Sequence, residues 1–207
     1  MFTGIIREIG TIQSIKPASP AKGRSGKGRG LLRLVLYAPK TASRAKPMES
    51  VSINGVCLTA VECGANDLVF EVIAQTQRSS ALGFLRPGGR VNVEPSLGVS
   101  DRLGGHWVFG HIDGTGVIAK RKQIQGELIL TIRLASKLRR LLVPKGPIAV
   151  NGVSLTVGPR LTQNSFTIHL IPETLRQTTL DDLKAGDRVN IELDYIAKLM
   201  WQFTKRK

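Results

Sequence analysis

The sequence NGVCLTA at residues 54–60 returns as NGVSLTV at residues 151–157. A longer stretch, QTQRSSALGFLRPGGRVNVE at 75–94, returns as ETLRQTTLDDLKAGDRVNIE at 173–192, with nine of the twenty positions identical. A weaker third match pairs TGIIREIGTI at 3–12 with FGHIDGTGVI at 109–118. An ordered repeat that spans most of a 207-residue chain predicts two similar domains joined in tandem.

Each half contains about six short runs that are apolar or alternate between apolar and polar residues, separated by Gly, Asn and Pro. This pattern predicts an all-β fold of two tandem, similar, six-stranded antiparallel barrels of the Greek-key type, because closure of a barrel removes exposed sheet edges. We expect the N-terminal barrel at residues 1–97 and the C-terminal barrel at 98–194. One short helix is predicted within the second half, at Ala135–Val143, with Ser136 as its cap.

A second helix is predicted at the C-terminus, over residues 195–207. Ile196, Leu199, Met200 and Phe203 repeat at helical spacing and place an apolar stripe on one face. A helix of this length is marginal in water, so the stripe needs a partner. The partner is either the same chain or another copy of it, and we favour association between copies.

The chain carries a formal net charge of +15, which is compatible with binding a polyanion. The positive charge is concentrated between Ile9 and Met48, where no acidic residue occurs, around a Gly-, Ser- and Pro-rich insertion at 16–30 in the first repeat. The insertion lacks aromatic residues for base stacking, so a solvated loop is favoured over a nucleic-acid site. A secretory signal and a membrane-length apolar segment are not recognisable, and Cys57 and Cys63 are too few for a disulfide framework, so a cytoplasmic location is predicted.

Differences between the two copies indicate where chemistry resides. Cys57 in the first copy corresponds to Ser154 in the second, and His111 in the second corresponds to Ile5 in the first. A duplicated barrel keeps its shape in both halves, whereas one half alone needs a given reactive group, so Cys57 and His111 are candidates for catalysis. Two simpler interpretations stay open, namely a small core cysteine and a histidine that caps a turn. His106, His111 and His169 lack the spacing of a metal site, and neither a metal nor a cofactor is predicted.

Six motifs occur in a fixed order along the chain: MFTGII at 1–6, NGVCLTA at 54–60, GGHWVFGHIDGTG at 104–116, VNGVSLTVG at 150–158, HLIPETLRQTTL at 169–180 and GDRVNIELD at 186–194. This set resembles the riboflavin synthase family over nearly the whole chain, apart from the basic insertion. The resemblance implies a cofactor-free homotrimer in which each barrel binds one 6,7-dimethyl-8-ribityllumazine. It also implies that the N-terminal barrel of one chain faces the C-terminal barrel of its neighbour, and that C-terminal helices hold the trimer together.

By the same resemblance, one lumazine donates a four-carbon unit to another, giving riboflavin and 5-amino-6-ribitylamino-uracil. Motif positions that match the family's active-site residues are Cys57, His111, Ser50, Asp194 and Phe2. Further positions match its substrate-binding residues, namely Gly4, Ile5, Ile6, Leu58, Thr59, Glu71, Val72, Ile73, Ala74, Gln75, Thr76, Gly110, Ile112, Lys145, Ser154, Leu155, Thr156, His169, Leu170, Ile171, Pro172, Glu173 and Thr174, together with Cys57 and His111.

One position departs from the family pattern and one rival function stays open. Gln75 stands where family members more often have a glutamate, so altered affinity for the substrate is expected. Lumazine proteins, which bind the chromophore without turnover, are similar to this family but tend to lose the cysteine and the histidine of the pocket. Because this chain has both Cys57 and His111, the enzyme is favoured over a non-catalytic lumazine or flavin carrier.

Overall fold

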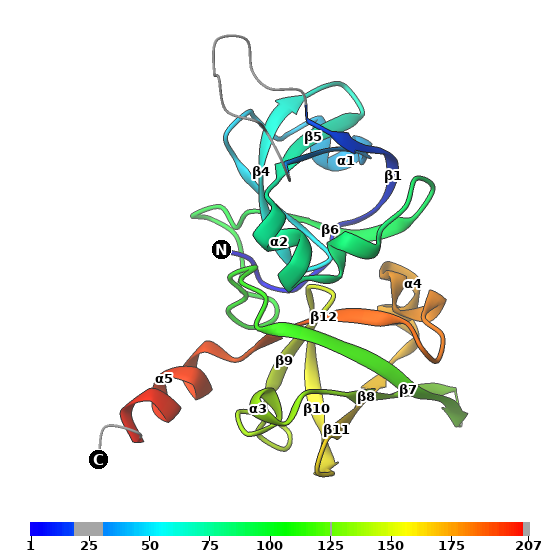
Figure 1. The fold of residues 1–207 in the computed structure, drawn as a ribbon, viewed down its shortest axis with the longest axis vertical. Coiled ribbons are helices and arrows are strands. Elements are labelled where there is room, and N and C mark those ends of the chain that lie inside the picture. Colours follow the sequence, from blue (N-terminus) through cyan, green and yellow to red (C-terminus); the bar gives the residue numbers. More distant parts are fainter. Residues whose placement is uncertain (19–30, 125, 205–207) are drawn as a thin grey trace.

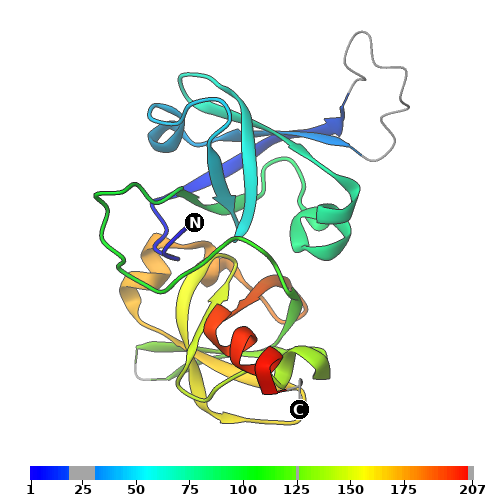
Figure 2. The same cartoon turned by 90° about the vertical axis from the view of Figure 1, so that its left-hand side faces the viewer.

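A computed structural model describes residues 1–18, 31–124 and 126–204, and two closed barrels follow one another along the long axis of the molecule (Figures 1 and 2). The centre of the basic insertion lies outside the described residues. The first barrel has the strand order β1-β2-β5-β4-β3-β6, with every neighbouring pair antiparallel. Its strands are β1 (Glu8–Pro17), β2 (Leu32–Tyr37), β3 (Ser50–Ile53), β4 (Val56–Cys63), β5 (Asp67–Val72) and β6 (Arg90–Pro95).

The second barrel repeats this topology. Its strands β7 to β12 pair in the same cyclic order as β1 to β6, which confirms the predicted all-β fold of two six-stranded antiparallel barrels. Because β3, β4 and β5 are joined by hairpins and β2 pairs with β5 after a longer connection, the connectivity is that of a Greek key. The strands of this barrel are β7 (Gly114–Ile124), β8 (Glu127–Arg133), β9 (Pro147–Val150), β10 (Val153–Leu161), β11 (Ser165–Leu170) and β12 (Arg188–Leu193).

Each barrel encloses its own apolar core. Alternate residues of the strands point inward, so Leu36 and Phe70 lie fully buried in the first core and Leu130 and Ile168 in the second. Burial of such side chains removes apolar surface from water at roughly 25 cal/mol per Å2 and stabilises each barrel. The two cores are separate clusters, but Ile6 of the first repeat belongs to the second core and Ile112 of the second repeat packs against the first.

The repeated Asn-Gly pair forms the turn at the tip of a β-hairpin in each barrel. Asn54 and Gly55 both have positive φ, at 46° and 81°, and the flanking Ile53 and Val56 are paired across the two-residue loop. Asn151 and Gly152 repeat this geometry at 47° and 78°. Such turns match the right-handed twist of the strands, which explains the preference for Asn-Gly. The tips touch, since a Cβ on Gly55 would lie 2.6 Å from the backbone nitrogen of Gly152.

Buried asparagines join the barrels in reciprocal pairs around these tips. The Nδ2 atom of Asn92 donates to the carbonyl oxygen of Asn151 at 3.0 Å, and that of Asn190 donates to the carbonyl oxygen of Asn54 at 2.8 Å. Both amides are hydrogen-bonded through both of their polar atoms, because each Oδ1 atom accepts from a backbone N–H group of the opposite repeat. The two barrels are therefore related by an approximate twofold arrangement with satisfied buried polar groups.

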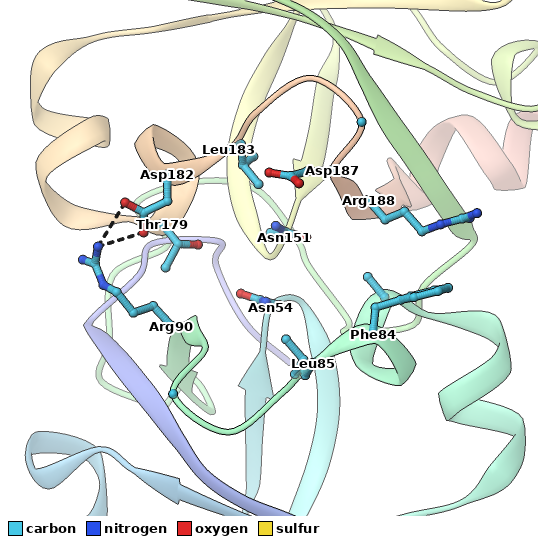
Figure 3. Close-up of a pocket in the computed structure, with 13 residues that line it drawn as sticks. Asn54, Phe84, Leu85, Arg90, Asn151, Thr179, Asp182, Leu183, Asp187 and Arg188 are labelled. Carbon is cyan, nitrogen blue, oxygen red and sulfur yellow. Dashed lines mark hydrogen bonds and ion pairs between the residues drawn. The ribbon is translucent and has the colours of Figure 1, made fainter.

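A groove of about 600 Å3 opens along this interface (Figure 3). On one side Arg90 forms an ion pair with Asp182 at 2.8 Å, and on the other side the Arg188 guanidinium lies 4.9 Å from the centre of the Phe84 ring. Phe84 and Asp182 occupy equivalent positions of the repeat, so the same contact is an ion pair in one half and a cation–π pair in the other.

The helices are short and lie outside the barrels, as α1 (Pro39–Ala42), α2 (Ala74–Ser79), α3 (Ser136–Arg139) and α4 (Pro172–Gln177). The helix predicted at 135–143 is shorter than expected, and Ser136 is its first residue instead of its cap, with no capping bond from a side chain. Beyond Arg139 the chain tightens into i→i+3 bonds, and Leu138 and Leu142 are both buried in the second core.

Helix α5 (Tyr195–Thr204) forms where the apolar periodicity predicts a C-terminal helix and extends away from the second barrel (Figure 1). None of its residues is buried, and Ile196, Leu199, Met200 and Phe203 are between 41 and 63 % exposed. The last predicted residues, 205–207, lie outside the described residues. Among residues 1–18, 31–124 and 126–204, no helix has the length and apolar character that crossing a membrane requires.

Candidate functional site

The leading segment of each repeat packs against the barrel of the other repeat. Gly4, from the first repeat, accepts a hydrogen bond from the backbone N–H of Ser154 at 2.8 Å, and Gly110, from the second, accepts one from Cys57 at 3.0 Å. Both glycines have positive φ, and a Cβ on either would lie 2.6 Å from the Cβ of its partner. The leading segments around Gly4 and Gly110 are therefore exchanged between the repeats. Each of the two pockets described below combines residues of both repeats.

Two buried glutamates fix the exchanged segments. Glu94, at the end of β6, accepts from the N–H groups of Thr3 and Gly4 at 2.7 and 3.0 Å and from the Thr3 hydroxyl at 2.8 Å. Glu192, at the equivalent position of β12, accepts from the N–H groups of Phe109 and Gly110 at 2.8 and 2.9 Å. Burial raises the pKa of Glu192 to about 7 and also raises the pKa of Glu94, while the backbone hydrogen bonds oppose the shift in both.

The first pocket, which we call the Cys57 pocket, has a volume of about 180 Å3. Strand β4 supplies Cys57, helix α2 supplies Thr76, and the exchanged segment supplies His111. Its lining consists of Val56, Cys57, Thr76, Ser79, Ser80, Gly110, His111 and Ile112. The base of α5 steadies the exchanged segment from outside, because the Tyr195 ring lies 4.9 Å from that of Phe109 and Lys198 pairs with Asp113 at 2.9 Å.

The second pocket, the Ser154 pocket, has a volume of about 450 Å3. Its lining consists of Gly4, Ile5, Ile6, Arg7, Val153, Ser154, Ile171, Glu173, Thr174, Gln177 and Thr178. The Oγ atom of Ser154 lies 2.7 Å from Nδ1 of His106, which comes from the segment between the barrels. Burial lowers the pKa of His106, and Asp194 opposes this shift, so the imidazole is neutral near pH 7 and suited to accept a proton.

The pairing of barrel and segment brings together predicted residues that are distant in sequence. Cys57 and His111 line one pocket with Thr76, Gly110 and Ile112. The other pocket holds Gly4, Ile5, Ile6, Ser154, Ile171, Glu173 and Thr174 from the predicted set. The two linings have no residue in common.

Other predicted residues lie outside both linings. Phe2 is fully buried between the barrels, where it pairs with Val108. Ser50 pairs with Thr59 at the start of β3, and Asp194 accepts from two N–H groups in the first turn of α5 at 3.3 and 3.4 Å. The Nδ1 atom of His169 lies 2.6 Å from Oε1 of Glu127, on the exposed face of β11. The other predicted residues that lie outside both linings are Leu58, Thr59, Glu71, Val72, Ile73, Ala74, Gln75, Lys145, Leu155, Thr156, Leu170 and Pro172.

Sequence reasoning missed three groups at this site. The histidine spacing bears on His106 only as a metal ligand, but the two glycines that precede it are a signal for a close backbone approach. A Cβ on Gly105 would lie 2.8 Å from Ser154. Glu94 and Glu192 are identical in the two repeats and end apolar strands. A carboxylate in such a place is a sequence signal for a buried, hydrogen-bonded charge.

Comparison with known proteins places this duplicated small-molecule-binding barrel among its relatives. The model of the lumazine binding domain family matches residues 3–96 and again residues 109–194. Riboflavin synthase from Bacillus subtilis (strain 168) is 36% identical over 203 residues, which cover 98% of this chain and 89% of the relative. Riboflavin synthase from Mycobacterium tuberculosis (strain ATCC 25618 / H37Rv) is 38% identical, with 96 and 95% covered.

Solved structures show the same architecture. LumP complexed with 6,7-dimethyl-8-(1'-D-ribityl) lumazine superposes with a TM-score of 0.79 at 21% identity, covering 94% of this chain and 99% of LumP. LumP complexed with riboflavin gives a TM-score of 0.80 at 22% identity, with 94 and 100% covered. The family model and the fold thus define a protein built from two copies of the lumazine binding domain. The sequence relatives are more specific, and the chain belongs to the riboflavin synthase family.

Proposed function

We propose that this chain is an enzyme that catalyses the riboflavin synthase reaction, the dismutation of two 6,7-dimethyl-8-ribityllumazine molecules into riboflavin and 5-amino-6-ribitylamino-uracil. The observation that carries the proposal is the meeting of Cys57 and His111 in one pocket of a chain that is similar over its length to curated riboflavin synthases. A thiol and an imidazole at one site provide a nucleophile and a group that moves protons.

The reaction requires two heterocycles held face to face, since such positioning makes a slow bimolecular step effectively intramolecular. The two pockets of one chain share no lining residue, and the Cys57 pocket, at about 180 Å3, is smaller than the roughly 300–1,000 Å3 typical of ligand pockets. Both facts support an active site completed by a neighbouring chain, with the Cys57 pocket of one subunit facing the Ser154 pocket of the next.

The two pockets differ in the chemistry that they offer. In the Cys57 pocket we assign to Cys57 the nucleophile, or the polarisation of a water, at the acceptor carbon, and to His111 the transfer of protons. In the Ser154 pocket the Ser154 hydroxyl lies 2.7 Å from the neutral imidazole of His106. That pair is suited to removing a proton from the 7-methyl group of a bound lumazine, which is acidic because the heterocycle delocalises the carbanion.

A homotrimer is the assembly that we propose. Ile196 and Met200 of the exposed apolar stripe on α5 line a cleft of about 420 Å3, together with Leu141 and Val143 of the second barrel. An isolated chain leaves this surface in water, and a neighbouring copy would cover it. The roles that the resemblance gives to Phe2, Ser50, Asp194 and Lys145, the domain boundaries at 97 and 194, and the cytoplasmic location remain predictions.

Incubation of the purified protein with 6,7-dimethyl-8-ribityllumazine as sole substrate tests the proposal. We expect riboflavin to form with no added cofactor, with two lumazines consumed for each riboflavin. Tight binding of the lumazine without turnover would contradict the enzyme and identify a non-catalytic carrier instead. Absence of both binding and turnover would contradict both functions.

A further inference from the structure

A basic pocket adjoins the Ser154 pocket. It has a volume of about 570 Å3, and Arg7, Lys40 and Arg44 line it together with Thr41, Ser43 and Asp101. Arg7 belongs to the lining of both pockets, so the two spaces meet at this side chain. The three cations outnumber the one carboxylate, which gives the pocket a net positive charge.

A buried carboxylate, that of Glu8, holds helix α1 and its cations in place. Glu8, at the start of β1 and next to Arg7, accepts from the backbone N–H groups of Lys40 and Thr41 at 3.0 and 2.8 Å and from the Thr41 hydroxyl at 2.8 Å. Glu8 is 9% exposed, and these bonds fix α1 against the barrel. The cations at Lys40 and Arg44 are thereby presented beside Arg7.

The second barrel lacks this arrangement. Gly114 takes the place of Glu8 and Leu138 that of Thr41, and these two residues pack together without polar contacts, since a Cβ on Gly114 would lie 2.8 Å from Cδ1 of Leu138. Asp113 takes the place of Arg7 and is paired with Lys198 at 2.9 Å. A cationic edge is therefore built into the Ser154 pocket and replaced by an acidic residue beside the Cys57 pocket.

The cations are available to a ligand. Within residues 1–18, 31–124 and 126–204, Arg7, Lys40 and Arg44 form no ion pair. The carboxylate of Asp101 accepts from the N–H of Gly98 at 2.8 Å. Lumazine and riboflavin carry an uncharged ribityl chain, so neither requires a cluster of three cations at the edge of the pocket.

We propose that the basic pocket binds a phosphate at the end of a ribityl chain whose heterocycle lies in the Ser154 pocket. The ligand class is a flavin 5′-phosphate, and flavin mononucleotide is its simplest member. Such a ligand occupies the place of a substrate and inhibits turnover. The phosphorylated form of the product therefore inhibits the enzyme. The inference rests on the proposed function, because it requires that the Ser154 pocket accept lumazines and flavins.

Binding of riboflavin and of flavin mononucleotide to the full chain, followed through quenching of flavin fluorescence, tests the inference. We expect flavin mononucleotide to bind about tenfold more tightly at low salt, the equivalent of one added charge-assisted hydrogen bond. The advantage shrinks at high salt because the cations are exposed. In the turnover assay, flavin mononucleotide inhibits at correspondingly lower concentration than riboflavin.

Variants locate the effect. Lys40→Gln and Arg44→Gln, alone and combined, remove the advantage of flavin mononucleotide while riboflavin affinity and lumazine turnover stay unchanged. Lys137→Gln is the matched control, because Lys137 is the repeat equivalent of Lys40 on α3, and it retains the full advantage.

Each other outcome has a distinct meaning. Equal affinity for the two flavins in the wild-type chain overturns the inference and leaves the proposed function intact. An advantage that survives in the combined variant places the phosphate elsewhere and also overturns it. Inorganic phosphate that binds without any advantage for the phosphorylated flavin shows a separate anion site and contradicts the shared ligand. Failure of riboflavin itself to bind contradicts the proposed function.

Discussion

The backbone N–H of Cys57 donates to the carbonyl oxygen of Gly110 at 3.0 Å, and this bond ties the first barrel to a segment of the second repeat. The next residue after Gly110 is His111, so the bond holds the backbone that carries the imidazole against the strand that carries the thiol. The equivalent bond between Ser154 and Gly4 organises the other pocket. Several properties of the protein depend on these two contacts.

Gly110→Ala tests the close approach of the Gly110 backbone to Cys57. A Cβ at this position would lie 2.6 Å from the Cβ of Cys57, and φ of 76° is unfavourable for alanine by about 1 kcal/mol before the collision is counted. We expect a loss of thermal stability and of most turnover. Gly126→Ala is the control, since its φ is 82° but no atom lies within 4 Å of an added Cβ. Equal effects of the two substitutions would show that the contact with Cys57 is unimportant.

Glu192 makes the stability of the fold dependent on pH. Its folded-state pKa of about 7 lies above the usual value of 4.5, so the folded chain holds a proton that the unfolded chain releases between these two values. The free energy of unfolding therefore falls as pH rises from about 4.5 to 7, by on the order of 3 kcal/mol, and levels off above pH 7. Urea titrations across this range should show the slope in the wild type and a shallower one in Glu192→Gln. Equal slopes in the wild type and in Glu192→Gln would contradict the assignment of this pH dependence to Glu192.

Cys57 and His111 are predicted to act in turnover and not in folding. Cys57→Ser and His111→Asn should each lower kcat by about a hundredfold or more, the usual scale for loss of a nucleophile or a proton-transfer group, with unchanged melting temperature. Cys63→Ser serves as the control, because Cys63 lies on the same strand outside both pockets. Wild-type rates in both pocket variants, measured as riboflavin formation, would refute their roles.

The His106–Ser154 pair predicts a second, distinct kinetic effect. Because burial lowers the pKa of His106 below its usual 6.5, the acid limb of kcat/KM should lie below pH 6.5. His106→Gln and Ser154→Ala should each slow turnover at least tenfold and abolish that limb, while lumazine binding is retained. Retention of the wild-type pH profile in His106→Gln would assign the limb to another group.

The apolar stripe on α5 predicts the oligomeric state. Ile196→Lys combined with Phe203→Lys places two charges on exposed apolar positions of the helix and should dissociate the assembly into monomers, as measured by light scattering during gel filtration. Turnover should be lost with the assembly. Gln202→Lys, at an exposed position off the stripe, should leave both unchanged. A wild-type chain that is already monomeric and active would contradict the proposal.

The barrels were predictable from the sequence because their determinants are local. Strand alternation and the Asn-Gly turns depend on neighbouring residues. The same turn occurs once in each repeat, at Asn54 and at Asn151, and so indicates two similar barrels. The short extent of α3 was not predictable, because nothing in the sequence signals that the chain beyond Arg139 continues in i→i+3 bonds, with Leu142 buried in the second core.

The exchange of segments could not be derived from the sequence. Whether Gly4 packs against Cys57 or against Ser154 is a choice between two equivalent barrels, and nothing local to Gly4 distinguishes them. The comparison of the copies did identify Cys57 and His111 as unlike positions, but their meeting in one pocket depends on that exchange. The partner of His106 could not be predicted either, because Ser154 is 48 residues distant in the chain and only the fold brings the two together.

The central claim is that one active site combines the Cys57 pocket of one chain with the Ser154 pocket of another. Co-expression of differently tagged Cys57→Ser and Ser154→Ala chains, followed by purification on both tags, gives mixed assemblies in which some sites contain both intact pockets. The account predicts riboflavin formation well above that of either parent variant alone. Mixed assemblies no more active than their parents would contradict it.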